Sequence, residues 1–174
     1  ATPAGSAAQT MHAAALGAHA QALRDWAAVA ERLPHTAITT VYAHAPHARL
    51  ALPVLALRGA PAQFVFDRGQ LSDDPGHQGV LAFVISASNG ERDELQAAVL
   101  AQAQTELGLP LQPVQTVVEK RATFACVPGV QRPPAHVAPG LWVAGDYVHG
   151  PYPATLEGAV RSGLAAAKLA TGAV

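Results

Sequence analysis

The sequence predicts a mixed α/β (α+β) fold in which a β-sheet with flanking helices precedes a separate strand–loop–helix segment. Two long segments of helical periodicity surround several short clusters of β-branched and aromatic residues. A connector rich in proline and glycine, residues 128–140, then leads to a last apolar strand and helix. Because the composition changes at this connector, we predict two domains, over residues 1–129 and 130–174.

The expected helices are marked by apolar residues three and four positions apart and by residues that stop helices. These helices cover residues 8–32, 91–107 and 155–169. Pro34 stops the first helix, and Gly108 stops the second. Ser88 or Asn89 is expected to cap the second helix at its N-terminus.

The expected strands are short and rich in Val, Ile, Thr and aromatic residues. They cover residues 37–43, 54–57, 63–66, 79–86, 114–124 and 141–144. Residues 79–86 form a nearly continuous apolar run, which is typical of a buried strand. Asp67-Arg68-Gly69 predicts a turn after the third strand.

Composition and charge narrow the class of protein. The chain has 174 residues, of which 50% are hydrophobic and 13% charged, so a packed core is expected. The net charge of −1 and the lack of a basic stripe give no support for nucleic-acid binding. Cys126 is the single cysteine, and His44 and His47 flank Pro46 at a strand end, so we expect no metal site.

The chemically informative segment lies between Leu141 and Gly163. An apolar strand ends at Gly145, Asp146 follows at once, and a six-residue loop leads to a helix with Pro153 near its start. The first N–H groups of a helix are unpaired and carry partial positive charge, so they attract an anion or a polarised carbonyl oxygen. A tightly packed strand–helix crossover without a ligand remains open on these residues alone.

Small residues inside the last helix point to close packing. Gly158 and Gly163 each cost about 1 kcal/mol relative to alanine in a helix interior. Gly158 and Ser162 are four residues apart, as are Ala159 and Gly163, so one face of the helix lacks large side chains. We therefore expect another backbone or a flat ligand to approach this face.

The same segment resembles the C-terminal flavin-binding segment of the amine oxidase and phytoene desaturase superfamily. The matching residues are Ala144-Gly145-Asp146, Pro153-Ala154-Thr155, Glu157-Gly158-Ala159 and Ser162-Gly163. Residues 38–42, 63–68 and 119–124 also resemble one branch of that superfamily, the hydroxysqualene dehydroxylases, also called squalene-associated FAD-dependent desaturases. Two features differ from the family pattern, since Tyr147-Val148 replaces Trp-Thr and residues 149–153 are rich in proline.

The resemblance implies FAD as the cofactor and roles for several of the matched residues. The residues expected to contact FAD are Gly145, Asp146, Pro153, Ala154, Thr155, Leu156, Gly158 and Ala159. Asp146 would accept a hydrogen bond from a ribityl hydroxyl, and Gly145 would let the backbone approach the cofactor. Backbone N–H groups near Ala154, Thr155 and Leu156 would face the N1–C2=O2 edge of the flavin. Gly158 and Ala159 of the last helix would leave space for the cofactor.

The resemblance further implies an oxidoreductase that acts on a long isoprenoid. The implied reaction is reductive dehydroxylation of hydroxysqualene to squalene in hopanoid biosynthesis, and no catalytic residue is identified. The alternatives are a carotenoid (phytoene-type) desaturase or an amine oxidase and, from another class, a non-catalytic fragment or partner subunit. Tyr42, Phe64 and Phe66 are interpreted as core residues, with the lining of an apolar substrate channel as the alternative.

The superfamily begins with a strand, a G-x-G-x-x-G loop and a helix that hold the pyrophosphate, and no glycines here have that spacing. We therefore expect the C-terminal part of a Rossmann-like FAD-binding domain, joined to part of a substrate domain. The N-terminal FAD-binding half, in the same or a separate chain, is the expected partner. We expect a cytoplasmic protein able to contact a membrane peripherally, in which this chain alone binds FAD weakly or not at all.

Overall fold

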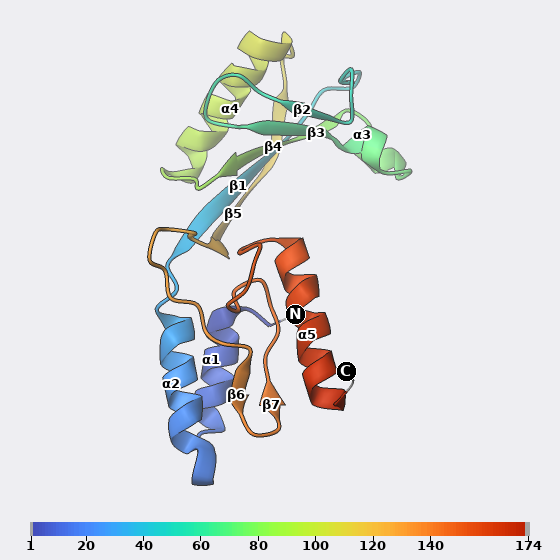
Figure 1. The fold of residues 1–174 in the computed structure, drawn as a ribbon. Coiled ribbons are helices and arrows are strands. Elements are labelled where there is room, and N and C mark those ends of the chain that lie inside the picture. Colours follow the sequence, from blue (N-terminus) through green and yellow to red (C-terminus); the bar gives the residue numbers. More distant parts are fainter. Residues whose placement is uncertain (1, 173–174) are drawn as a thin grey trace. The chain divides into compact units, whose positions relative to one another are not determined.

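The computed structural model describes residues 2–172 and divides them into two compact units (Figure 1). The helical unit comprises residues up to His35 and from Thr123 onward, and the sheet unit comprises Thr36–Ala122. Residues 1, 173 and 174, which end the two predicted domains, lie outside the described range. The boundaries of the two units differ from those of the predicted domains, 1–129 and 130–174. The functional roles predicted for those domains stay predictions.

The sheet unit contains a five-stranded sheet in the order β2-β3-β4-β1-β5. Its strands are β1 (His35–His44), β2 (Val54–Ala56), β3 (Phe64–Asp67), β4 (Val80–Ser86) and β5 (Gln112–Phe124). The β1–β4, β3–β4 and β2–β3 pairs are antiparallel. All five strands lie within a few residues of their predicted positions, and the predicted mixed α/β fold is confirmed.

Helix α4 (Arg92–Leu107) packs its apolar side on one face of this sheet. The core there joins Val99 of α4 to Val41, Val65 and Phe83, which have no exposed surface. Side chains alternate between the two faces along a strand, so every second residue faces α4.

Two local predictions for the sheet unit were wrong. Helix α4 is capped by Glu91, which makes no side-chain capping bond, instead of Ser88 or Asn89. The turn predicted at Asp67-Arg68-Gly69 begins a short helix, α3 (Arg68–Leu71), because the Asp67 side chain accepts a capping bond from the Gly69 N–H group. A 3₁₀ turn, η2 (Pro75–His77), follows α3. Gly108 ends α4 as predicted, with a left-handed φ of 66°.

The helical unit combines two N-terminal helices with the C-terminal strand–helix segment. Its elements are α1 (Ala4–Ala13), η1 (Gly17–His19), α2 (Ala20–Glu31), β6 (His136–Ala138), β7 (Leu141–Trp142) and α5 (Leu156–Thr171). The single helix predicted over residues 8–32 is two helices, because the chain turns at Gly17 with a φ of 71°, which favours glycine. The connector contains the short strand β6, which was not predicted because the surrounding prolines disfavour a strand.

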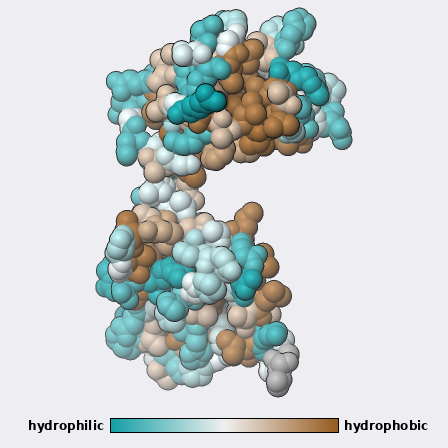
Figure 2. Space-filling model, turned by 45° about the horizontal axis from the view of Figure 1, so that its top comes forward, coloured by the Kyte–Doolittle hydropathy of each residue, from teal (hydrophilic) through white to brown (hydrophobic). Residues whose placement is uncertain are grey.

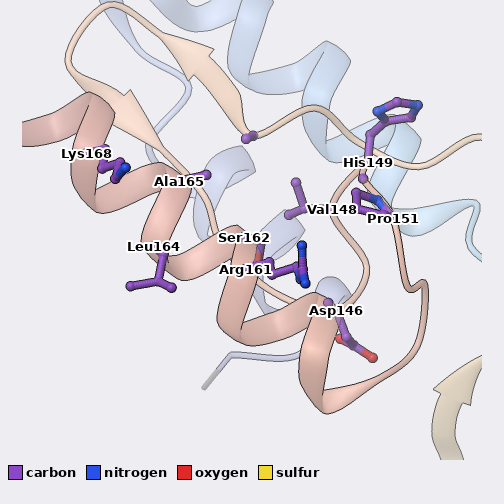
Figure 3. A pocket seen from close by; sticks show the side chains of 12 residues that line it. Asp146, Val148, His149, Pro151, Arg161, Ser162, Leu164, Ala165 and Lys168 are labelled. Carbon is purple, nitrogen blue, oxygen red and sulfur yellow. The ribbon is translucent and has the colours of Figure 1, made fainter. Parts of the chain in front are cut away.

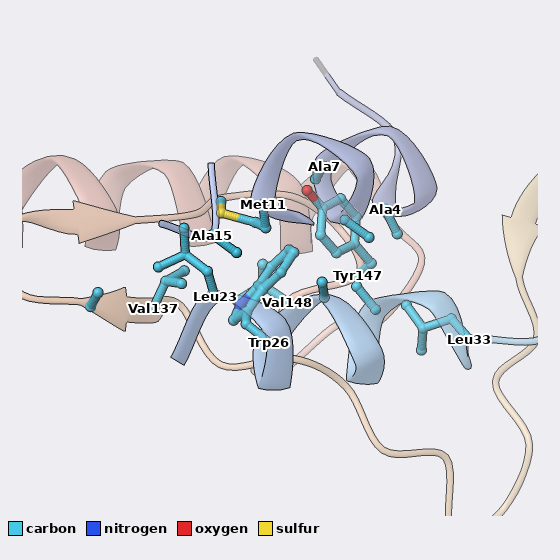
Figure 4. Close-up of a cluster of buried hydrophobic side chains, with 14 of the residues drawn as sticks. Ala4, Ala7, Met11, Ala15, Leu23, Trp26, Leu33, Val137, Tyr147 and Val148 are labelled. Atoms are coloured by element: carbon cyan, nitrogen blue, oxygen red, sulfur yellow. The ribbon is translucent and has the colours of Figure 1, made fainter. Parts of the chain in front are cut away.

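Helices α1 and α2 form a core with the connector and the loop after β7 (Figure 4). Trp26 of α2 is 3% exposed, and its indole N–H group donates a hydrogen bond of 2.8 Å to the Pro134 carbonyl oxygen. The Tyr147 ring meets the Trp26 ring edge-on, with the ring centroids 6.5 Å apart. The N-terminal helices therefore position the loop that follows β7.

A buried carboxylate organises one edge of the sheet unit. Asp67 is 2% exposed and accepts hydrogen bonds from the Leu50 N–H group at 2.9 Å and the Gly69 N–H group at 3.1 Å. The side-chain amide of Gln70 donates a third bond of 2.7 Å. These bonds fix the segment before β2 against the end of β3.

Replacing this carboxylate should destabilise the sheet unit. Asp67→Ala leaves the buried Leu50 N–H group without its acceptor, and we expect a loss of about 2–4 kcal/mol in the free energy of unfolding. Asp74→Ala is the matched control, because Asp74 accepts only a surface capping bond from Gly76, and it should cost about 1 kcal/mol or less. Urea unfolding of the two variants measures the difference, and equal losses would contradict this account.

Candidate functional site

The candidate site lies in the loop between β7, which ends at Trp142, and α5, and its first predicted residue is Gly145. The Ser162 hydroxyl of α5 accepts a hydrogen bond of 2.9 Å from the Gly145 N–H group. The same oxygen lies 3.0 Å from the Gly145 carbonyl oxygen and 2.9 Å from that of Ala159, to either of which it can donate. Ser162 thus links the loop after β7 to α5. From the sequence, Ser162 was recognised only as part of the motif and not in this bridging role.

The proline-rich connector fixes the far side of the loop. The Arg132 guanidinium donates hydrogen bonds to the carbonyl oxygens of Val148, at 3.0 Å, and Gly150. The His149 N–H group donates to the Pro133 carbonyl oxygen at 2.9 Å. Arg132 was not among the predicted site residues, since a single arginine between prolines carries no periodic signal. The loop is therefore held at Gly145 by Ser162 and at residues 148–150 by the connector.

Asp146 lies at a cavity of about 460 Å³ between this loop and α5 (Figure 3). Val148, His149, Arg161, Leu164 and Lys168 also line the cavity. The Asp146 backbone carbonyl accepts a hydrogen bond from the Ala154 N–H group at 3.3 Å. Across residues 2–172, no side chain or backbone group hydrogen-bonds to the Asp146 carboxylate. A half-buried carboxylate without an internal partner is available to a ligand's donor group.

Thr155 is the N-cap of α5. Its hydroxyl accepts a hydrogen bond of 3.0 Å from the Gly158 N–H group and donates to the Tyr152 carbonyl oxygen at 2.6 Å. Pro153 lies two residues before the cap, near the start of the helix as predicted. The N–H groups of Leu156 and Glu157 are in the first turn and have no acceptor within the helix. The cofactor role of this helix end stays a prediction.

The backbone before α5 adopts an unusual conformation. Tyr152 and Ala154 have φ angles of 58° and 55°, in the left-handed region that disfavours residues with a Cβ atom. Each such residue costs on the order of 1 kcal/mol. A Cβ atom on Gly158 would lie 2.1 Å from the Tyr152 carbonyl oxygen, so only glycine permits this path.

The two glycines of α5 serve different purposes. Gly158 makes room for the chain's own loop, whereas a Cβ atom on Gly163 would have no neighbour within 4 Å among the described residues. Internal packing therefore accounts for Gly158 and leaves Gly163 unexplained. The expectation that Gly158 and Ala159 leave space for a cofactor stays a prediction.

Glu157 and Arg161 link the first turn of α5 to the loop. The Arg161 side chain pairs with the Glu157 carboxylate and stacks over the Tyr152 ring, 4.9 Å from the ring centroid. The Glu157 carboxylate is thus engaged within the chain.

Tyr42, Phe64 and Phe66 belong to the sheet unit and lie on the sheet face opposite α4. Strand pairing aligns Tyr42 with Ala82 and Phe66, and it aligns Thr40 with Val84 and Phe64. Phe64 is 44% exposed and Tyr42 and Phe66 are half-buried, so their interpretation as core residues was wrong for Phe64. Figure 2 shows hydrophobic residues exposed on this unit.

Within the described chain, no group of three or more His, Cys, Asp or Glu side chains is placed to hold a metal ion. None of its helices combines the length and apolar character needed to cross a membrane.

The different surroundings of the two glycines predict opposite effects of the same substitution. Gly158→Ala places a methyl group against the Tyr152 carbonyl oxygen, and we expect a loss of about 1–3 kcal/mol in stability. Gly163→Ala meets open space and should gain up to about 1 kcal/mol from improved helix propensity. Thermal unfolding of the two variants checks the signs, and a stabilising Gly158→Ala would refute the proposed contact.

Burial raises the pKa of the Tyr147 phenol, and the nearby Asp146 carboxylate raises it further. Because the folded state holds this proton more tightly, its contribution to stability is complete below the unfolded pKa of about 10. It is lost as the pH rises from there through the folded pKa. Unfolding free energies measured from pH 8 to 11 should fall less steeply in Tyr147→Phe than in the unmodified chain. Parallel pH profiles would contradict this assignment.

Comparison with known proteins identifies the family. Residues 19–171 match the family described as flavin containing amine oxidoreductase. The chain is 38% identical over 96 residues to a hydroxysqualene dehydroxylase of Rhodopseudomonas palustris, covering 49% of this chain and 23% of that protein. Proteins of the same name from Zymomonas mobilis and Sinorhizobium fredii are 38% and 48% identical over 99 and 63 residues. These segments cover 52% and 34% of this chain and 24% and 15% of the relatives.

The chain therefore spans about a quarter or less of the length of the curated relatives that it matches. The family match covers most of the chain and includes the loop, the N-terminus of α5 and the sheet unit. Its description implies a flavin cofactor. On this evidence, the chain belongs to the flavin-containing amine oxidoreductase family.

Proposed function

We propose that this chain forms part of an FAD-dependent oxidoreductase that converts hydroxysqualene to squalene in hopanoid biosynthesis. The family match supports the flavin chemistry, and the names of three relatives support the substrate. The observation that carries the proposal is the Asp146 carboxylate, which has no hydrogen-bond partner among residues 2–172 and lies on a held loop beside the N-terminus of α5.

The residues of the loop fit one end of a flavin cofactor. The Asp146 carboxylate can accept a hydrogen bond from a ribityl hydroxyl group, and such a charge-assisted bond is stronger than a neutral one. The free N–H groups of Leu156 and Glu157 and the helix dipole favour a polarised carbonyl oxygen nearby. Ser162 and Arg132 hold the loop in this arrangement before a ligand arrives.

The chain's own residues do not supply the redox step. When bound in its reduced form, a flavin would supply the hydride that replaces the substrate hydroxyl, which would leave with a proton as water. A reduced flavin carries negative charge, so the partial positive charge at the α5 N-terminus would favour the reduced form. The loop contributes fixed dipoles that need no rearrangement during the reaction.

The sheet unit offers a surface suited to an isoprenoid chain. Phe64, Phe66 and Val84 lie side by side on the face opposite α4, next to Tyr42. A substrate with no charge and many methyl groups gains free energy by covering such side chains, at about 25 cal/mol per Å² of buried apolar area. We propose that this face contacts the hydrocarbon part of the substrate.

The proposed enzyme also needs a dinucleotide clamp. We propose that a family nucleotide-binding half with a G-x-G-x-x-G loop completes the site, in the same polypeptide or as a separate chain. The test mixes this chain with such a half from the R. palustris relative and adds FAD, a reductant and hydroxysqualene. Squalene formed only in the mixture supports the proposal. Conversion of phytoene or an amine in place of hydroxysqualene would overturn the choice of substrate.

Loss of the Asp146 carboxylate should weaken flavin binding. Asp146→Ala removes one charged acceptor, and we expect FAD affinity in the mixture to fall roughly 10-fold to 100-fold. Glu157→Gln is the control, because Glu157 is engaged with Arg161, and its effect should be small. Titration of flavin absorbance and fluorescence measures both affinities. An unchanged affinity in Asp146→Ala would exclude Asp146 from the cofactor site.

A further inference from the structure

Arg161 of α5 reaches back to the loop that precedes the helix. Its Nε–H group donates a hydrogen bond to the carboxylate of Glu157, one turn earlier in α5. Its guanidinium group also lies over the Tyr152 ring, 4.9 Å from the ring centroid. A guanidinium group can make both contacts at once, because its edge donates hydrogen bonds while its planar face stacks on an aromatic ring. Arg161 thus joins the first turns of α5 to the segment at Tyr152.

The stability of the fold does not explain this arrangement. The side chains of Arg161 and Glu157 are 56% and 54% exposed, and an exposed ion pair contributes little to the free energy of unfolding. Tyr152 is 51% exposed and belongs to neither hydrophobic core. Its φ of 58° lies in the left-handed region, which a residue with a Cβ atom adopts only where its surroundings favour it. A weak contact is sufficient for this purpose, since a small bias shifts the populations of two backbone conformations of similar energy.

Hydrogen bonds connect the segment that Arg161 holds to Asp146. The Tyr152 carbonyl oxygen accepts a hydrogen bond of 2.6 Å from the Thr155 hydroxyl. Between these two residues, Ala154 has a φ of 55° and donates its N–H group to the Asp146 carbonyl oxygen at 3.3 Å. Asp146 and Arg161 also line the same cavity (Figure 3). A change in the backbone conformation of Tyr152 would therefore move the hydrogen-bond donor that holds Asp146.

We propose that Arg161 is a positioning residue for the candidate cofactor site, which acts on Asp146 through the Tyr152 ring and the N–H group of Ala154. This inference rests on the proposed function, in which the Asp146 carboxylate binds FAD. Arg161 keeps the left-handed segment in place, and the segment keeps Asp146 at the cavity. Glu157 directs the guanidinium group, and a glutamine at that position can still accept the same hydrogen bond.

The first test follows backbone hydrogen exchange in the chain without flavin. Arg161→Met removes the charge and the planar face, and we expect the N–H groups of Ala154 and Gly158 to exchange roughly threefold to tenfold faster. Tyr152→Ala should have the same effect, whereas Tyr152→Phe keeps the ring and should change the rates little. Lys168→Met is the matched control for charge, because Lys168 lines the same cavity but its ammonium group makes no hydrogen bond or ion pair among residues 2–172. Equal rates in Arg161→Met and in the control would overturn the positioning role.

The second test measures FAD affinity in the mixture with the nucleotide-binding half of the R. palustris relative. Arg161→Met should weaken FAD binding by roughly threefold to tenfold. If Arg161 acts through Asp146, the same substitution should have little further effect when Asp146 is already alanine. Equal losses of affinity in both backgrounds would overturn the inference, because they would show that Arg161 acts independently of Asp146. Circular dichroism confirms that each variant folds.

The positioning role and the proposed function fail on different measurements. Exchange rates that Arg161→Met leaves unchanged refute the positioning role, even where the mixture binds FAD through Asp146. Faster exchange at Ala154, in a chain whose mixture takes up no FAD, supports the hold of Arg161 on the loop and refutes the proposed function. Faster exchange together with a loss of FAD affinity that requires Asp146 supports both.

Discussion

The packing of Tyr147 is the interaction on which the candidate site depends. Its ring is 5% exposed, meets Trp26 edge-on and lies against the backbone of Gly145. Trp26 in turn holds the connector through the Pro134 carbonyl oxygen. One aromatic side chain thus joins the N-terminal helices to a loop more than a hundred residues later. Without this contact, the hydrogen bonds from Ser162 and Arg132 would not connect the loop to the N-terminal helices.

This anchoring explains how the loop maintains a strained path. The left-handed residues Tyr152 and Ala154 are unfavourable on their own, and such conformations persist only where the surroundings determine them. Here Thr155, Gly158 and the Arg161 stack on Tyr152 all act on the same short segment. The result is a preorganised start of α5, in which the backbone N–H groups are held in place. Preorganisation of this kind lowers the entropic cost of ligand binding.

Local pattern predicted the elements well and their contacts poorly. The β-branched clusters located the five strands of the sheet unit, and the left-handed stop at Gly108 followed from glycine's backbone freedom. The break at Gly17 was missed because apolar spacing continues across it. The exposure of Phe64 was also missed, since alternation shows that a strand has two faces without showing which one is covered.

The candidate site was located by its motif, but its supporting contacts were beyond the sequence. The segment around Asp146 was predicted from a strand end, a carboxylate and a following helix. The clamp by Arg132 and the bridge by Ser162 join residues 16 to 18 positions apart through loop geometry that no periodicity encodes. Gly158 was expected to make room for a ligand, which stays a prediction, and the structure shows that it makes room for the Tyr152 carbonyl oxygen.

The contact between Gly145 and Tyr147 has a consequence for how sequences of this family can diverge. A Cβ atom on Gly145 would lie 2.6 Å from the Tyr147 ring, so the two positions compete for the same volume. A chain that keeps an aromatic residue at position 147 in this packing must keep glycine at position 145. A chain with a smaller residue at 147 is free to accept alanine or serine at 145. These two positions should therefore covary, and a glycine at position 145 would reflect the packing of the residue at position 147.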